Sequence, residues 1–252
     1  MRLRHIQYLS TRSFKVPKIV ISGITSYSDV NDQRFQSCLR FLEGAEALGI
    51  PVYLADSSPH PIQEQLRART LGGLVDGSGS YTEKKIRSLR VAAEVGAEAI
   101  VITEMEKEGL LPYLEAICTP IHRGRADLVI PERTEASWAS YPKEFEIERF
   151  ALAQIEQFTG RYLDTMLGAF VIRRSEAYRF LACQEEMWAW LHVPRFQMIR
   201  EKPERVVGLP IDFLYPPEQR EAEEGNPAFH LKRIGQLQYS LIRPLLAVYG
   251  NK

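Results

Sequence analysis

The chain has 252 residues, of which 45% are hydrophobic and 25% charged, which is the composition of an ordinary globular protein. Its 32 basic and 32 acidic side chains give a formal net charge of zero, which argues against the basic surface that general nucleic-acid binding requires. No apolar run approaches the roughly 20 residues of a membrane-spanning helix, and the N-terminus lacks the apolar core of a signal peptide. We therefore expect a cytoplasmic protein without a transmembrane segment.

The first half of the chain alternates short apolar runs with helical patterns. Residues 1–17 are basic and irregular and are expected to form an N-terminal arm. Strands are predicted at 18–22, 51–55 and 99–102, and helices at 33–48, 62–69 and 81–93. A strand-helix-strand order is the building block of a parallel sheet.

The second half continues the alternation of strands and helices. Helices are predicted at 110–117, 143–158 and 231–248, and strands at 126–130, 168–172 and 205–214. Pro210 lies inside the last of these strands, which favours an edge position in the sheet. The length and the pattern together predict one large α/β domain without internal repeats.

The cysteines and histidines show no spacing typical of a metal or redox centre. Cys38, Cys118 and Cys183 fit neither a zinc site nor a disulfide framework, and the five histidines are scattered. Reduced and buried thiols are the expected state of the three cysteines. No set of serine, histidine and aspartate or of cysteine and histidine indicates a nucleophilic enzyme.

An acidic cluster directly follows the apolar run at 99–102. Ligands of open α/β sheets bind beyond the carboxyl ends of the strands, and Glu104 and Glu106 come at such an end. Two carboxylates at this spacing can hold a hard divalent cation together with substrate phosphates. The alternative is a solvated, acidic start to the next helix, where carboxylates suit the helix dipole.

Three further positions are candidates for ligand contacts. Asp56 follows the strand at 51–55, where it can bind a nucleoside or simply form an Asp-Ser turn. The glycine-rich stretch 72–80 has neither the dinucleotide fingerprint nor the P-loop pattern. Lys84 and Lys85 follow it near the start of a helix, where they can meet a diphosphate or form a solvated basic face. Gly168 would let a ligand approach the backbone closely.

The order of these pieces resembles glycosyltransferases of the GT-A fold, particularly the family-2-like group, and also the mannosylglycerate synthase type. The stretches that carry the resemblance are 51–58, 77–93, 99–112 with 123–133, and 165–174, with a weaker match at 206–217. The resemblance implies a Rossmann-like, mostly parallel sheet flanked by helices in one domain, 18–252. Residues 18–134 would form its nucleotide-binding half and 135–252 its acceptor-binding half.

The resemblance also implies an activity, which is transfer of a hexose-like sugar from a nucleotide-diphosphate sugar to a small-molecule or lipid-linked acceptor. A homo-oligomer is compatible with this interpretation. The implied nucleotide-sugar contacts are Asp56, Lys84, Lys85, Leu167 and Gly168. The implied ligands of Mg²⁺ or Mn²⁺ are Glu104, Glu106 and His230. The candidate catalytic bases of an inverting enzyme are Asp164, Glu185 and Glu186.

One departure from the family pattern leaves two alternatives open. The family usually carries Asp-x-Asp, and this chain has Glu104-Met105-Glu106 at that place. A catalytically inactive nucleotide-sugar-binding protein would fit this replacement. A sugar-phosphate nucleotidyltransferase would share the α/β core, although the chain lacks the early glycine-rich loop with arginine that such enzymes carry.

Overall fold

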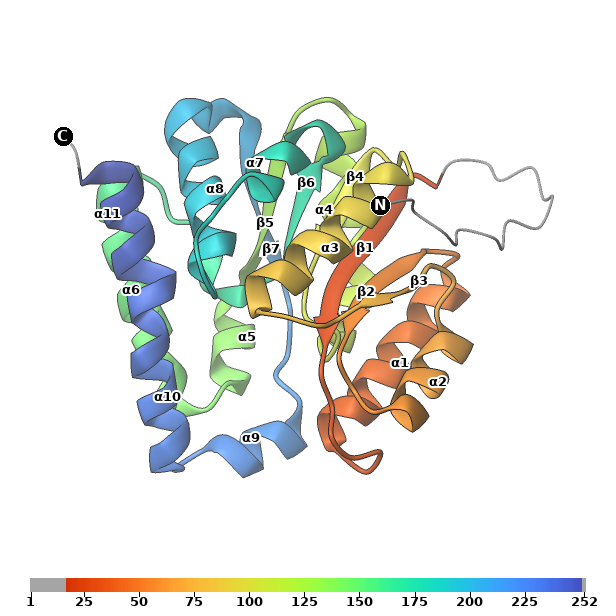
Figure 1. Ribbon diagram of the computed structural model, residues 1–252. Helices are drawn as coiled ribbons and strands as arrows, with labels where there is room; N and C mark the ends of the chain where they lie inside the picture. The colour runs from red at the N-terminus through yellow and green to blue at the C-terminus, as the bar shows by residue number, and fades with distance from the viewer. Residues whose placement is uncertain (1–16, 251–252) are drawn as a thin grey trace.

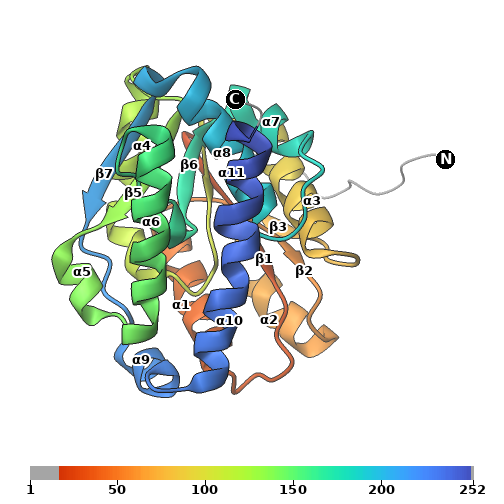
Figure 2. The same cartoon turned by 90° about the vertical axis from the view of Figure 1, so that its left-hand side faces the viewer.

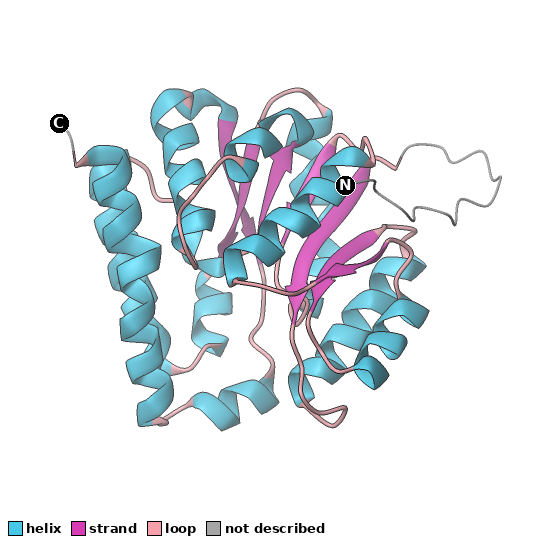
Figure 3. Ribbon diagram, in the orientation of Figure 1, coloured by secondary structure: helices cyan, strands magenta, loops and turns pink. Residues whose placement is uncertain are grey.

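The computed structural model describes residues 17–250, so the predicted arm at 1–17 lies outside the described residues except for Pro17. A single sheet runs through the middle of the molecule, and helices pack on both of its faces (Figures 1 and 3). The strands are β1 (Ile19–Thr25), β2 (Val52–Asp56), β3 (Gly73–Asp76), β4 (Ala99–Ile102), β5 (Leu128–Arg133), β6 (Phe170–Arg173) and β7 (Val206–Ile211). The single, mostly parallel α/β domain predicted from the sequence is confirmed.

The helices alternate with the strands along the chain. The α-helices are α1 (Gln33–Ala47), α2 (His60–Arg69), α3 (Tyr81–Glu94), α4 (Leu114–His122), α5 (Glu135–Ser140), α6 (Glu146–Thr159), α7 (Ala177–Leu181), α8 (Ala189–Glu201), α9 (Pro217–Glu223), α10 (Pro227–Leu237) and α11 (Arg243–Tyr249). The 3₁₀ helices are η1 (Glu108–Tyr113), η2 (Lys143–Phe145), η3 (Thr165–Leu167), η4 (Arg174–Glu176) and η5 (Pro203–Arg205), and a π-helical turn, η6 (Gln238–Ile242), joins α10 to α11.

The strand order is β3-β2-β1-β4-β6-β5-β7, and β6 is the one strand that runs against its neighbours among the described residues. The other strands therefore end at one common edge of the sheet, and β6 begins there. Ile102 at the end of β4 pairs with Phe170 at the start of β6. This register brings the residues after β4 beside those before β6, although they are more than sixty positions apart in the sequence.

Helices cover the two faces of the sheet from opposite sides. Helix α3 packs on β1 and β2, while α4 packs on β4 and β5 from the other side (Figure 2). Helices α6, α10 and α11 stand side by side at one end of the molecule. Among the described residues, no helix is long and apolar enough to cross a membrane.

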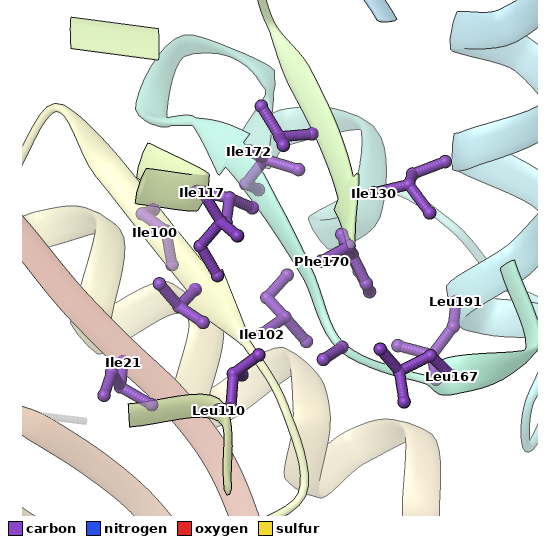
Figure 4. Packing of buried hydrophobic residues seen from close by; sticks show 14 of the residues in the cluster. Ile21, Ile100, Ile102, Leu110, Ile117, Ile130, Leu167, Phe170, Ile172 and Leu191 are labelled. Atoms are coloured by element: carbon purple, nitrogen blue, oxygen red, sulfur yellow. The ribbon is translucent and has the colours of Figure 1, made fainter. Parts of the chain in front are cut away.

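The core explains why these segments form strands and helices. All four residues of β4 are buried, as a strand covered on both faces requires. Figure 4 shows Ile100 and Ile102 of β4 packed with Phe170 and Ile172 of β6. Each fully buried side chain of this size contributes about 1.5–3 kcal/mol through burial.

The start of helix α3 was predicted from the sequence, but strand β3 was not. Ser80 and Glu83 form a reciprocal capping box that fixes the start of α3 where it was predicted. Strand β3 was missed, because its four residues come directly from the glycine-rich stretch and are only partly buried.

Strand β7 lies at the edge of the sheet, as its proline predicts. The cysteines are free, and Cys183 is only half-buried.

Candidate functional site

A cavity of about 320 Å³ opens at the edge where the parallel strands end. Its walls include residues of α1, α3, the loop after β4, β5, α6, η3, α8, the segment after β7, α9 and α10. Leu167 and Leu191 form part of its apolar wall and lie at the end of the packed core in Figure 4. Elements from both halves of the chain thus enclose one cavity.

Glu104 and Glu106 both line this cavity, as do Leu167 and Gly168. Gly168 has a left-handed backbone with φ +82°, and a Cβ atom built on it would lie 4.0 Å from Oε2 of Glu104. Glycine adopts this conformation without steric cost. The pairing of β4 with β6 therefore brings the predicted acidic pair and the predicted glycine together.

Each glutamate of the acidic pair already has a cationic partner. Lys107 Nζ lies 2.9 Å from Oε2 of Glu104. Arg34 Nη2 lies 2.8 Å from Oε1 of Glu106, and that oxygen also accepts a hydrogen bond from Tyr27 at 3.1 Å. The chain itself thus offsets much of the negative charge of the pair. Arg34 and Lys107 were not predicted from the sequence, because spacing alone does not show which cations fold onto the acidic cluster.

Lys85 provides a positive charge beside the acidic pair. Its side chain is 2% exposed and lines the cavity, and its ammonium lies 5.6 Å from the ring of Tyr81. Burial lowers the pKa of Lys85 to about 8, although Glu104 and Glu106 oppose the shift. Within residues 17–250 no hydrogen bond or ion pair holds this ammonium, so it is available to an anion in the cavity.

The charge of Glu104 is strongly favoured at neutral pH. Enclosure by the cavity raises the pKa of Glu104, but the ammonium groups of Lys107 and Lys85 outweigh this effect and bring it to about 2. The side chain nevertheless remains 45% exposed. A carboxylate that is ionised, accessible and beside an unpaired ammonium can contact a ligand that carries both positive and negative groups.

Asp56 and Lys84 lie outside the lining of the cavity. Asp56 is 3% exposed, and its carboxylate accepts hydrogen bonds from Thr25, at 2.7 Å, and from Ser58. Lys84 Nζ donates to the hydroxyl of Ser57 at 2.6 Å. These contacts tie the segment after β2 to β1 and to α3, so both residues shape the neighbouring edge of the site rather than its cavity.

Asp164 is fully buried and is not among the residues that line the cavity. Its carboxylate accepts from Arg133 Nε at 2.7 Å and from Nη2 at 2.8 Å, and it also caps η3 through the backbone of Leu167. Such a carboxylate is not open to an acceptor hydroxyl. The structure thus corrects the expectation that Asp164 is a base and assigns it to a buried ion pair.

Three other predicted residues are also outside the cavity lining. Glu186 is exposed, and Glu185 is half-buried on the segment before α8. His230 is exposed on α10, and the described residues contain no group of three side chains able to hold a metal ion. The expected ligand set of Glu104, Glu106 and His230 is therefore not assembled, because the imidazole lies on the outer side of its helix.

A buried charge chain forms the far wall of the cavity. Glu148 accepts from Arg133 at 2.9 Å and from Arg233 of α10 at 3.1 Å. The guanidinium of Arg133 lies 3.6 Å from the ring centre of Trp138. Arg133 ends β5, so the same strand-end rule that found Glu104 would have found it. No pattern in the sequence predicted that Glu148 and Arg233 belong to the site.

The acidic pair fits a cation that is shared with a phosphate ligand. Glu104 Oε1 and Glu106 Oε2 have no hydrogen-bond or ion-pair partner among the described residues, since Lys107 and Arg34 hold the other oxygens. Mg²⁺ is commonly held by one or two carboxylates together with substrate phosphates and water. Two free carboxylate oxygens meet this need.

No protein-family model matches the sequence, and no curated protein sequence is significantly similar to it. Solved structures do share its fold. Glucosyl-3-phosphoglycerate synthase from Mycobacterium tuberculosis superposes with a TM-score of 0.64 at 12% identity, over 93% of this chain and 81% of that chain. Mannosyl-3-phosphoglycerate synthase from Rubrobacter xylanophilus gives 0.62 at 10%, over 92% and 73%.

The first of these neighbours is also known as a complex with Mn²⁺, uridine-diphosphate-glucose and phosphoglyceric acid, which superposes at 0.64 and 12% identity over 93% of this chain and 80% of that one. These likenesses show that the chain has the fold of GT-A-type nucleotide-diphospho-sugar transferases. The resemblance inferred from the order of sequence motifs is confirmed at the level of the fold.

Proposed function

We propose that this protein transfers a sugar from a nucleotide-diphosphate sugar to a small anionic acceptor. The observation that carries the proposal is the buried, unpaired ammonium of Lys85 beside Glu104 and Glu106, in a cavity at the carboxyl edge of the sheet. Ligands of open α/β sheets bind at this edge. The fold shared with nucleotide-sugar transferases supports the same function.

Lys85 would contact the diphosphate of the donor, and Lys107 would share its charge between Glu104 and that group. A fixed positive charge at the leaving diphosphate stabilises the charge that develops as the sugar departs. Leu167 and Gly168 would contact the sugar, because Gly168 presents bare backbone to the cavity beside Glu104. We keep the prediction that the segment after β2, which Asp56 holds in place, contacts the nucleoside.

Glu104 and Glu106 would hold Mg²⁺ or Mn²⁺ through their two unpartnered oxygens. Such an ion acts as a Lewis acid on the diphosphate when it is bound. The Mycobacterium tuberculosis neighbour is known with Mn²⁺, which supports this assignment. Because Lys107 and Arg34 already neutralise the pair in part, we expect the ion to bind together with the nucleotide and not before it.

The acceptor would lie against α10. Lys232 lines the cavity and has no ion-pair partner among residues 17–250, while Arg233 beside it is held by Glu148. A second unpaired ammonium on the cavity wall favours an acceptor with a phosphate or carboxylate of its own. The phosphoglyceric acid bound by the neighbour has this chemistry, so 3-phosphoglycerate is the first acceptor to test.

A binding protein without turnover is the second candidate, and one observation favours it. Two of the three predicted metal ligands, Glu104 and Glu106, are engaged by cations of the chain itself. Products distinguish the candidates, because a transferase releases nucleoside diphosphate, a binding protein releases nothing, and a nucleotidyltransferase releases pyrophosphate.

The first experiment is thermal unfolding with the glucose and mannose derivatives of UDP, GDP and ADP, each with and without Mn²⁺. A ligand at 100 times its dissociation constant adds about 2.7 kcal/mol to the free energy of unfolding. Lys85→Met should abolish the stabilisation by the active donor. Lys18→Met is the control, because this exposed lysine directly precedes β1 at the opposite edge of the sheet and should leave the response unchanged.

Release of nucleoside diphosphate is then measured with the donor that stabilises the protein and with 3-phosphoglycerate. Release that depends on Lys85 would support a transferase. Equal stabilisation of wild type and Lys85→Met would refute the diphosphate site. Stabilisation without any release would favour the binding protein.

A further inference from the structure

The segment between α7 and α8 contains a strained backbone position. Met187 has φ +52°, and among the described residues it is the only one other than glycine with a positive φ. A left-handed backbone is costly for a residue with a Cβ atom and persists only where the surrounding structure holds it in place. Residues kept in such a conformation cluster at ligand sites, so the side chains beside Met187 are candidates for a ligand contact.

Trp188 follows the strained residue and lines the cavity together with Tyr81 of α3. The two ring centres lie 6.1 Å apart at an interplanar angle of 47°, so the rings form one continuous aromatic wall. Trp190, two residues further on, is fully buried and donates a hydrogen bond to the carbonyl of Phe180 at 2.8 Å. Of these two tryptophans, one therefore belongs to the core and the other to the cavity.

Backbone contacts on both sides hold Trp188 in place. Its carbonyl accepts two backbone hydrogen bonds, at 3.0 and 3.2 Å, from the first turn of α8. The carbonyl of Glu185 accepts a hydrogen bond from the hydroxyl of Thr82 at 3.2 Å, which ties the same segment to α3. Helix α7, which precedes the segment, also packs on α3 (Figure 1). The backbone of Trp188 is therefore fixed beside the helix that carries Tyr81.

The aromatic wall adjoins the ammonium proposed to contact the diphosphate. Lys85 Nζ lies 5.6 Å from the ring centre of Tyr81, which is one helical turn earlier on α3. The sugar of a nucleotide-diphosphate sugar is bonded directly to the diphosphate, so it lies against the surface next to the diphosphate site. A hexopyranose has one face made of C–H groups, and such a face is removed from water when it packs on aromatic rings.

We propose that Tyr81 and Trp188 bind the C–H face of the donor hexose. This inference rests on the transferase function proposed above, and it adds an apolar contact to those proposed for Leu167 and Gly168. Burial raises the pKa of the Tyr81 phenol, so the hydroxyl stays protonated and the wall stays uncharged at neutral pH. The wall thus contributes to the affinity for the sugar and not to the affinity for the diphosphate.

Calorimetry on three variants tests this separation with UDP-glucose, GDP-mannose and ADP-glucose, each compared with its free nucleoside diphosphate. Trp188→Leu removes the ring but keeps an apolar side chain, and it should weaken binding of the nucleotide sugar about tenfold. Its affinity for the free nucleoside diphosphate should equal that of wild type, because Lys85 is unchanged. Trp188→Phe keeps an aromatic ring and should lose less. Tyr178→Leu is the matched control, because this aromatic residue of α7 is 58% exposed and is not among the cavity-lining residues.

Tryptophan emission separates a contact with the sugar from a structural role. The nucleotide sugar should shift the emission of wild type, and this shift should vanish in Trp188→Phe, because Trp138 and Trp190 are not among the cavity-lining residues. A shift of the same size in Trp188→Phe would count against the contact.

Each outcome of the calorimetry decides one of the two proposals. Unchanged affinity of Trp188→Leu for a nucleotide sugar that wild type binds would overturn the aromatic wall and leave the transferase intact. An equal loss for the nucleotide sugar and the free diphosphate would also overturn it, because the ring would then support the pocket as a whole. A wild type that binds none of these nucleotides would overturn the proposed function and this inference with it.

Discussion

Removal of Asp164 tests whether this carboxylate supports the fold or the chemistry. Asp164→Ala deletes four hydrogen bonds, three to Arg133 and one to the backbone of Leu167. Breaking a buried ion pair typically costs about 3–5 kcal/mol, because the remaining charge loses its compensation. Glu148 still holds Arg133 at 2.9 Å, so we expect a loss in the lower half of that range.

The free energy of unfolding is measured by urea denaturation at pH 7, with the slope and midpoint compared with wild type. At roughly 2–4 °C per kcal/mol for a chain of this size, the melting temperature should fall by about 6–16 °C. Glu201→Gln is the control, because its ion pair with Arg179 has a 43% exposed carboxylate and should cost less than about 1 kcal/mol. If Asp164→Ala unfolds like wild type yet loses sugar transfer, the carboxylate acts in catalysis and this reasoning is wrong.

Three further predictions concern the cavity. Because the pKa of Lys85 is lowered in the folded protein, the unfolded chain binds more protons above pH 8. The free energy of unfolding of wild type relative to Lys85→Met should therefore rise between about pH 8 and 10. Denaturation curves of the two proteins over this pH range measure the change. Over the same range the affinity for nucleoside diphosphate should fall, because the ammonium loses its charge, and a flat affinity would count against the contact. Gly168→Ala should lose about 1–2 kcal/mol of stability, because alanine is strained in the left-handed backbone conformation, and it should also weaken donor binding. Gly49 is the control, because it also has a positive φ but open space around it, so Gly49→Ala should lose stability only. Calorimetry with Mn²⁺ should give little heat with the protein alone and a clear signal with nucleoside diphosphate present, and equal binding in both cases would contradict the shared site.

Much of the sheet could be predicted from the sequence, because β1, β2, β4 and β5 are short apolar runs bounded by polar residues. The position of Glu104 and Glu106 followed from the same rule. The reversal of β6 could not be predicted, since a four-residue apolar strand reads the same in both directions. Without the direction of β6, the sequence did not predict that Gly168 lies beside Glu104.

Other predicted site residues failed for a different physical reason. Sequence position showed that Asp164 and His230 lie near the right elements, but it did not show which way their side chains point. Asp164 turns into the core, because Arg133 ends β5 with a guanidinium that needs a buried partner. His230 turns outward, because Phe229 and Arg233 occupy the inner side of α10. Orientation within one helical turn depends on partners that are distant in the sequence.

The buried charge chain links the two ligand regions of the proposed site. Arg233 on α10 binds Glu148, Glu148 binds Arg133, and Arg133 binds Asp164, which caps η3 just before Gly168. The helix proposed to meet the acceptor is thus connected to the glycine proposed to meet the donor sugar. Because buried charges tolerate little displacement without losing compensation, the position of α10 and the backbone of η3 should be fixed together. This connection gives the four charged residues of the chain a structural role that is separate from ligand binding.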